Sequence, residues 1–147
     1  MSMYSKILIA VDFHVDNEEI VDKGVALSKA NDAELYFVHV NEPIAASYGA
    51  DGMSWSNQVV ALETGIRESA RKKMAELGEK TGLPADRCIT REGKPSREIH
   101  DVVKEHNIDL IVMGTHGQSG LQLLLGSTAN SVLHGATCDV LTVRVGD

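Results

Sequence analysis

The sequence is poor in several features on which whole classes of protein depend. It has no apolar run close to the roughly 20 residues that a membrane-spanning helix needs, so we expect no membrane association. Its first six residues lack the charged start, apolar run and small-residue cleavage site of a signal peptide. Together these absences predict a cytoplasmic protein.

Positive charge is also scarce. The chain has 14 Lys and Arg residues against 21 Asp and Glu residues, a formal net charge of −7. Nucleic acids demand basic patches, and the local basic cluster at residues 67–73 is interleaved with glutamates in the manner of a solvated helix face. We therefore predict no nucleic-acid partner.

Disulfide, metal and catalytic patterns are missing as well. Cys88 and Cys138 stand 50 positions apart without a CxxC pair, which predicts buried, reduced thiols. None of the six histidines has HExxH or another metal-ligand spacing, so we predict no protein metal site. The sequence places no acid or nucleophile beside His116, and we name no catalytic residue.

The residues that are present suit one globular domain. The chain has 147 residues, 43% of them hydrophobic, enough for a single core over residues 1–147. Short apolar runs predict strands at residues 6–12, 33–40, 87–91, 109–113 and 139–145. Helical periodicity predicts helices that follow Asp16 and that span residues 57–80, 95–106 and 127–134.

Local signals sharpen the helix boundaries. Asp16 with Glu19 resembles a capping box at the start of the first helix, Gly82 ends the second helix, and Pro95 suits the first turn of the third. The second helix is expected to bury one apolar stripe, made of Val59, Leu62, Ile66, Ala70, Met74 and Leu77.

Strands and helices alternate along the chain, which predicts an α/β fold: an open five-stranded parallel sheet with helices on both faces, Rossmann-like. The third strand is the weakest and is expected near an edge. Ligands of such folds bind beyond the carboxyl ends of the strands, near the switch in strand order. Asp12, Val40 and Gly114 stand at such ends, so we expect a binding site there, with His39 as a hydrogen-bonded core histidine.

A glycine-rich loop follows the fourth strand. Gly114, Gly117, Gly120 and Gly126 lie between the apolar run 110–113 and the last helix. Glycines let backbone N–H groups approach an anion, and a helix N-terminus adds positive partial charge. This arrangement predicts a phosphate cradle.

Other nucleotide and α/β motifs are excluded by position. The first strand is not followed by GxGxxG, the only Gly-Lys pair stands in no GxxxxGK[ST] pattern, and GxSxG is absent. A phosphoacceptor receiver domain has the right topology, but it needs an aspartate after the third strand and a lysine after the fifth. This chain has Glu92 and Arg144 there.

The combination that remains resembles the universal stress protein family. The likeness covers residues 4 to 145 and rests on the order and spacing of segments 6–12, 35–40, 93–95, 109–117, 124–127 and 138–144. It implies an adenine nucleotide alpha hydrolase-like fold and a stress-response or signalling role. It also implies ATP, ADP or AMP as the ligand, with Mg²⁺ as an optional bridge between phosphates.

The resemblance also implies the binding residues. Asp12 would lie near the ribose, the backbone of Val40 beside the adenine, and Met113 against the nucleotide. The implied set is Ala10, Val11, Asp12, Val40, Met113, Gly114, His116, Gly117, Gly120, Gly126, Ser127 and Thr128. The family pattern has nine residues between its second and third glycines, whereas this chain has eight, 118–125, a difference that Gly120 could absorb.

Three functions stay open at this point. A reversible nucleotide-binding module is favoured, because the loop keeps its glycines and Ser127. A dimeric interaction protein without nucleotide is the alternative, since one branch of the family has lost the motif. A slow nucleotide hydrolase would need a group to orient water, and none is placed by the sequence.

Two further expectations concern surfaces. The last strand is apolar on both faces and would be hazardous as a free edge. The resembled family commonly pairs this strand across a two-fold axis, so we expect a homodimer. The irregular segment 41–56 is long enough to be functional, and a lid over the pocket is our expectation.

Overall fold

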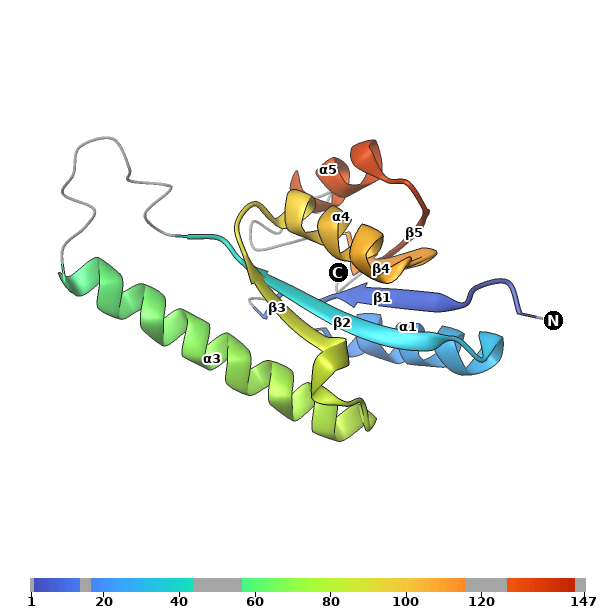
Figure 1. Cartoon of the computed structure of the whole chain (residues 1–147), viewed down its shortest axis with the longest axis horizontal. Helices are drawn as coiled ribbons and strands as arrows, with labels where there is room; N and C mark the ends of the chain where they lie inside the picture. Colours follow the sequence, from blue (N-terminus) through green and yellow to red (C-terminus); the bar gives the residue numbers. More distant parts are fainter. Residues whose placement is uncertain (1, 14–16, 44–56, 116–126, 145–147) are drawn as a thin grey trace.

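A five-stranded parallel sheet forms the centre of the molecule (Figure 1). The computed structural model describes residues 2–13, 17–43, 57–115 and 127–144. The strands are β1 (Lys6–Ala10), β2 (Glu34–Asn41), β3 (Cys88–Glu92), β4 (Leu110–Gly114) and β5 (Asp139–Val143). They lie in the order β3-β2-β1-β4-β5, with every neighbouring pair parallel. This confirms the predicted fold class and the edge position of the third strand.

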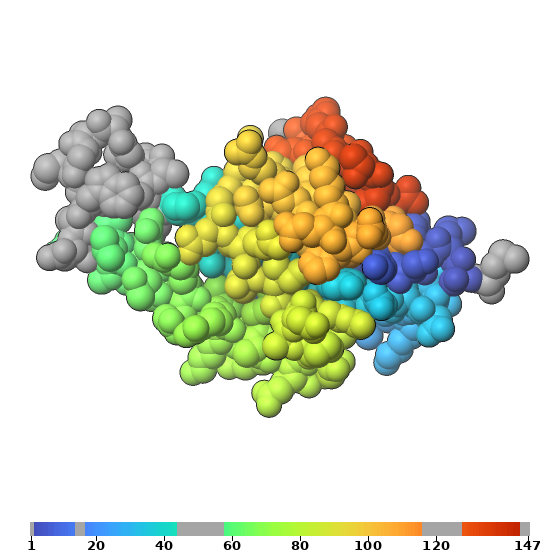
Figure 2. All heavy atoms as spheres, viewed as in Figure 1, coloured from blue at the N-terminus to red at the C-terminus, as the bar shows by residue number. Residues whose placement is uncertain are grey.

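Helices cover both faces of the sheet. The helices are α1 (Glu18–Asn31), α3 (Asn57–Thr81), α4 (Pro95–His106) and α5 (Ser127–Gly135), with a 3₁₀ turn η2 (Ala85–Arg87) before β3. Helices α1 and α3 lie on one face, and α4 and α5 lie together on the other (Figures 1 and 2). The two faces are called here the α1/α3 face and the α4/α5 face.

Alternate residues of the strands build two separate cores. Ile7, Ile9 and Phe37 belong to the core of the α1/α3 face, whereas Leu8 and Val38 belong to that of the α4/α5 face. The central strands are apolar at successive positions because both of their faces are covered. This is why the sequence shows continuous apolar runs in place of alternation.

The helix ends follow the predicted signals with one exception. Pro95 opens α4, and Gly82, with φ of +75°, follows α3. Helix α1 begins at Glu18, so the expected cap at Asp16 is wrong: Asn17 is the residue before the helix. The Asn17 side chain makes no hydrogen bond to the helix backbone and bonds the end of β1 instead.

The apolar stripe of α3 is only partly buried. Ala70 and Met74 are buried, but Leu62 is 56% exposed. The N-terminal half of α3 continues past the carboxyl ends of the strands, so it has no sheet to cover (Figure 1). The expectation that one stripe is buried along the whole helix is therefore wrong for its first turns.

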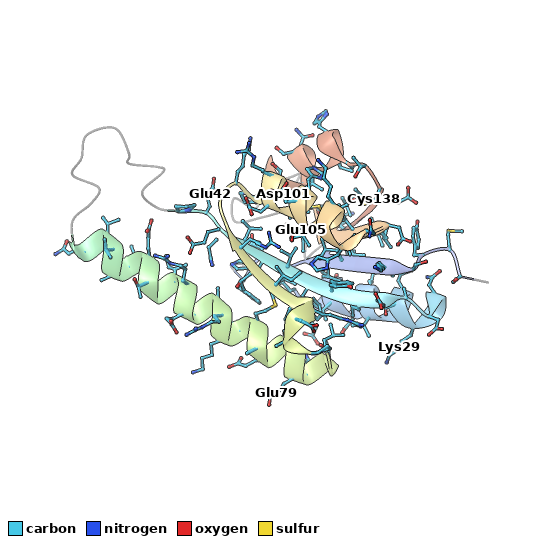
Figure 3. All side chains as sticks on the ribbon, viewed as in Figure 1. Lys29, Glu42, Glu79, Asp101, Glu105 and Cys138 are labelled. Carbon is cyan, nitrogen blue, oxygen red and sulfur yellow. The ribbon has the colours of Figure 1, made fainter. Side chains whose placement is uncertain are left out.

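Polar residues occupy the outer surfaces as expected. On α3, Arg67 pairs with Glu92 and Arg71 with Glu68, which agrees with a solvated basic face. Glu79 projects away from the same helix (Figure 3). Within the described ranges, no helix is both long and apolar enough to cross a membrane. Cys88 and Cys138 are free thiols, but they are half-buried, so the predicted full burial is wrong.

Candidate functional site

The carboxyl ends of β1 and β4 form the point where strand order reverses. Strand β1 pairs with β2 on one side and with β4 on the other, so the chain runs outward in opposite directions from this pair. In an open parallel sheet the connections that leave two such strands diverge to opposite faces, which opens a crevice at their ends. Asp12 follows β1 and Gly114 ends β4, so the fold brings them to this crevice.

The position of Asp12 is set by Asn17, which sequence reasoning did not single out. The Asp12 N–H donates to Asn17 Oδ1 at 3.1 Å, and Asn17 Nδ2 donates to the Asp12 carbonyl at 2.8 Å. Both backbone groups of Asp12 are thus held by one side chain. An asparagine directly before a helix was the available signal, but it is also what an ordinary helix cap looks like.

The backbone of Val40 faces the same crevice. In a parallel strand the N–H and C=O groups of one residue point to the same side, and the side alternates along the strand. The Val38 carbonyl accepts from Val11 N on the β1 side, whereas the Asn41 carbonyl accepts from Gly93 N on the β3 side. The N–H and C=O of Val40 therefore face the β1 side, just beyond the last residue of that strand.

Three predicted residues share one patch of core. Ala10 and Val40 are half-buried and pack against the α4/α5-face core, which contains the buried Met113. Gly114 is half-buried and pairs with Val143 of β5, and Thr128 is half-buried in the first turn of α5. The end of β1, the end of β4 and the start of α5 thus meet on one face of the sheet.

Val11 differs from the rest of the predicted set. Its side chain belongs to the core of the α1/α3 face and is 5% exposed. Its N–H donates to Val38, and its carbonyl accepts from His39 Nδ1 at 2.9 Å. The backbone of Val11 therefore links the end of β1 to β2 by hydrogen bonds. Its side chain lies on the α1/α3 face, whereas those of Ala10, Val40 and Met113 lie on the α4/α5 face.

His39 is a hydrogen-bonded core residue, as expected. It is 6% exposed, and because the Val11 carbonyl can only accept, Nδ1 carries the proton. The other ring nitrogen, Nε2, lies 3.1 Å from the atom placed as Asn41 Oδ1; since Nε2 must accept when Nδ1 donates, the Asn41 amide presents its Nδ2 here. With both nitrogens bonded, His39 positions strand ends and has no free group for catalysis.

The central part of the glycine loop lies outside the described residues. This applies to His116, Gly117, Gly120 and Gly126, to the side chain of Ser127, and to most of the expected lid segment 41–56. Among the residues described, no group of three His, Cys, Asp or Glu side chains is arranged to hold a metal ion.

Comparisons with known proteins point to one family. The model of the universal stress protein family matches residues 3–144 of this chain. Universal stress protein A homolog 2 of Coxiella burnetii is 38% identical over 146 residues, which cover 99% of this chain and 98% of the relative.

Solved structures agree on the fold. The universal stress protein UspA from Lactobacillus plantarum matches with a TM-score of 0.80 at 23% identity, over 98% of this chain and all of the other. A universal stress protein in complex with cAMP matches with a TM-score of 0.57 at 22% identity, over 97% of this chain and 98% of the other.

Proposed function

This chain belongs to the universal stress protein family, and from that premise we propose that it binds an adenine nucleotide reversibly, as a cytoplasmic stress-response or signalling module. One observation carries the proposal. The sheet reverses its order between β1 and β4, and it brings Asp12, the backbone of Val40 and Gly114 to that switch. The glycine-rich segment that follows Gly114 leads into the N-terminus of α5.

The residues at the crevice fit the parts of a nucleotide. The Asp12 carboxylate can accept hydrogen bonds from ribose hydroxyls, and the N–H and C=O of Val40 can bond the edge of a purine. Backbone N–H groups at the start of α5 suit phosphates, with the helix dipole in support. The match to a universal stress protein that holds cAMP also supports an adenine nucleotide as the ligand class.

The segment proposed to bind the phosphates is one residue shorter than the family pattern. Eight residues, 118–125, separate Gly117 from Gly126, and we propose that Gly120 provides the turn that keeps the cradle intact. ATP, ADP and AMP would all be accepted, with Mg²⁺ bridging phosphates when two or more are present. We propose no general base, so hydrolysis is expected to be no faster than slow background turnover.

A titration with labelled ATP tests this proposal. Wild type should bind, and the Gly117→Val/Gly126→Val double variant should bind at least tenfold more weakly, because the added side chains fill the space that phosphates need. Gly65→Ala is a matched control, since a Cβ at that position on α3 meets nothing within 4 Å. Negligible binding by wild type, or equal binding by wild type and the double variant, would remove the nucleotide hypothesis.

We also propose that two chains pair through β5. This strand is an edge of the sheet, and after its first residue, Asp139, it carries no charge, with Leu141 37% exposed. The other edge, β3, is charged: Arg91 pairs with Glu105, and Glu92 with Arg67. Charged edges resist pairing, whereas an apolar edge calls for a partner. A dimer that bound no nucleotide would support the alternative role as an interaction protein.

A further inference from the structure

A pocket on the α1/α3 face lies outside the proposed nucleotide site. Its volume is about 310 Å³, and it lies between the carboxyl ends of β1 and β2 and the N-terminal half of α3. Phe13 and His39 line it from the sheet side, and Leu62 and Ile66 line it from α3. None of the described residues proposed to bind nucleotide lines this pocket.

The walls of the pocket are mainly apolar and aromatic, and Asn41 and Ser69 add polar groups. The rings of Phe13 and His39 lie 4.7 Å apart between centroids, tilted by 45°. Leu62 is 56% exposed, and its neighbour Val60 is 47% exposed, so apolar surface is left uncovered at this end of α3. Aromatic pairs of this geometry offer edges and faces to a further ring.

Gly65 leaves space in the wall of the pocket that α3 forms. Gly65 lies in the middle of α3, where glycine weakens a helix, and a Cβ added there would meet no atom within 4 Å. The space beside it is part of the pocket. A side chain added at this position would therefore project toward the pocket, and its Cβ would meet no clash.

One cation stands at the pocket. Lys73 lines it, and its Nζ lies 5.9 Å from the centroid of the Phe13 ring. The two arginines of α3 are paired, Arg67 with Glu92 and Arg71 with Glu68. In the part of the chain that the structure describes, no carboxylate forms an ion pair with Lys73. The pocket thus combines aromatic walls with one ammonium group, for which the described residues supply a ring contact and no ion pair.

We propose that this pocket binds a small aromatic carboxylate. The ring would lie against Phe13, Leu62 and Ile66, and the carboxylate would bond the Lys73 ammonium, with charge-assisted geometry. The volume lies at the lower end of the range for ligand pockets, which limits the ligand to one or two fused rings. This site does not depend on the proposed nucleotide function, because its lining shares no described residue with that site and the side chains of Ala10, Val40 and Met113 lie on the other face of the sheet.

An NMR titration with indole-3-acetate tests the inference. Wild type should show saturable shifts of amides at Gly65, Ser69 and Asn41, and indole-3-acetamide, the neutral isostere, should bind about fivefold more weakly. Gly65→Leu should abolish binding while the protein stays folded. Lys73→Met should weaken indole-3-acetate about fivefold, whereas Lys72→Met, its neighbour outside the pocket lining, should leave binding unchanged.

The nucleotide-loop variant separates the two sites. Gly117→Val/Gly126→Val should bind indole-3-acetate as wild type does. Absence of saturable shifts in wild type would overturn the inference. So would shifts centred on Gly114 and Thr115, unchanged binding by Gly65→Leu, or equal affinity for the acid and its amide.

Discussion

At the scale of the residue, the structure separates polar groups that are satisfied from those that are not. Asn17 bonds both backbone groups of Asp12, and His39 has a partner at each ring nitrogen. His100 on α4 is the opposite case: both of its ring nitrogens are buried, and neither has a hydrogen-bond partner among the residues that the structure describes. Burying an unpaired polar group costs about 1–3 kcal/mol.

Replacing His100 by an apolar residue of similar size should therefore stabilise the protein. We expect His100→Leu to raise the free energy of unfolding by about 1 kcal/mol, because it removes two unbonded ring nitrogens from the α4–α5 contact. Urea denaturation measures this. The control is His106→Leu: its ring packs on Tyr36 at 5.0 Å, so that change should not stabilise. Equal or lower stability of His100→Leu would contradict the prediction.

The two thiols are expected to react slowly. Burial raises the pKa of Cys88, with a further contribution from Asp86, and burial together with Asp139 and Asp109 raises the pKa of Cys138. A raised pKa lowers the thiolate fraction at any given pH, and thiolate is the reactive form. Reaction with a disulfide reagent at pH 7 should be slower than for free cysteine and should still be rising where free cysteine has levelled off. Unfolding in urea should remove the difference.

At the scale of the element, one glycine sets how closely α1 approaches the sheet. A Cβ at Gly24 would overlap Cδ1 of Ile9, a buried residue of β1, and would lie 2.6 Å from its Cγ1. The helix sits directly on the strand at this point, and no side chain fits between them. Gly65 on α3 is the contrasting case, since it faces open space.

Alanine at these two glycines should act in opposite directions. Gly24→Ala should lower stability by about 1–3 kcal/mol through overpacking, although alanine favours helices. Gly65→Ala should raise it by about 0.5–1 kcal/mol. Thermal or urea unfolding of the pair checks this, and Gly24→Ala/Ile9→Val should be less destabilised than the sum of the single changes. A neutral Gly24→Ala would mean that α1 can move away from β1.

At the scale of the whole molecule, the two edges of the sheet differ in character. The Val143 carbonyl accepts from Thr115 N on the β4 side, so by alternation the N–H of Thr142 faces outward from β5. The N–H of Thr90 faces outward from β3 in the same way, since Gly93 N donates to Asn41 of β2. The two threonines are therefore a matched pair at opposite edges.

Proline at these positions should distinguish them. Thr142→Pro removes an outward donor from the proposed dimer strand without touching the bonds to β4, and it should convert the dimer to monomer. Thr90→Pro should leave the dimer intact. Sedimentation at micromolar concentration measures both variants. A wild type that sediments only as a 15.9 kDa species would refute the proposed dimer.

Local chemistry explains which features could be predicted. The strand β4 and the start of α4 at Pro95 were predictable because they rest on a continuous apolar run and on a fixed φ. The start of α1 was not, because Asp16 and Asn17 are both residue types that cap helices. Only the fold shows that Asn17 precedes the helix and that its side chain bonds Asp12 in place of the helix backbone. Leu62 falls on the apolar stripe that the helical periodicity of α3 defines. No local sequence signal shows that α3 extends beyond the end of the sheet at this residue.

The sequence by itself determined the alternation of strands and helices, the strand ends that carry Asp12, Val40 and Gly114, and the family. These depend on hydrophobic periodicity and on short motifs, which are read along the chain. The tertiary structure decided the strand order, the face to which each side chain turns, and the space between elements. It placed the side chain of Val11 on the α1/α3 face and that of Met113 on the α4/α5 face, and it placed Lys73 at the lining of a pocket. Such relations depend on contacts between segments that are distant in sequence.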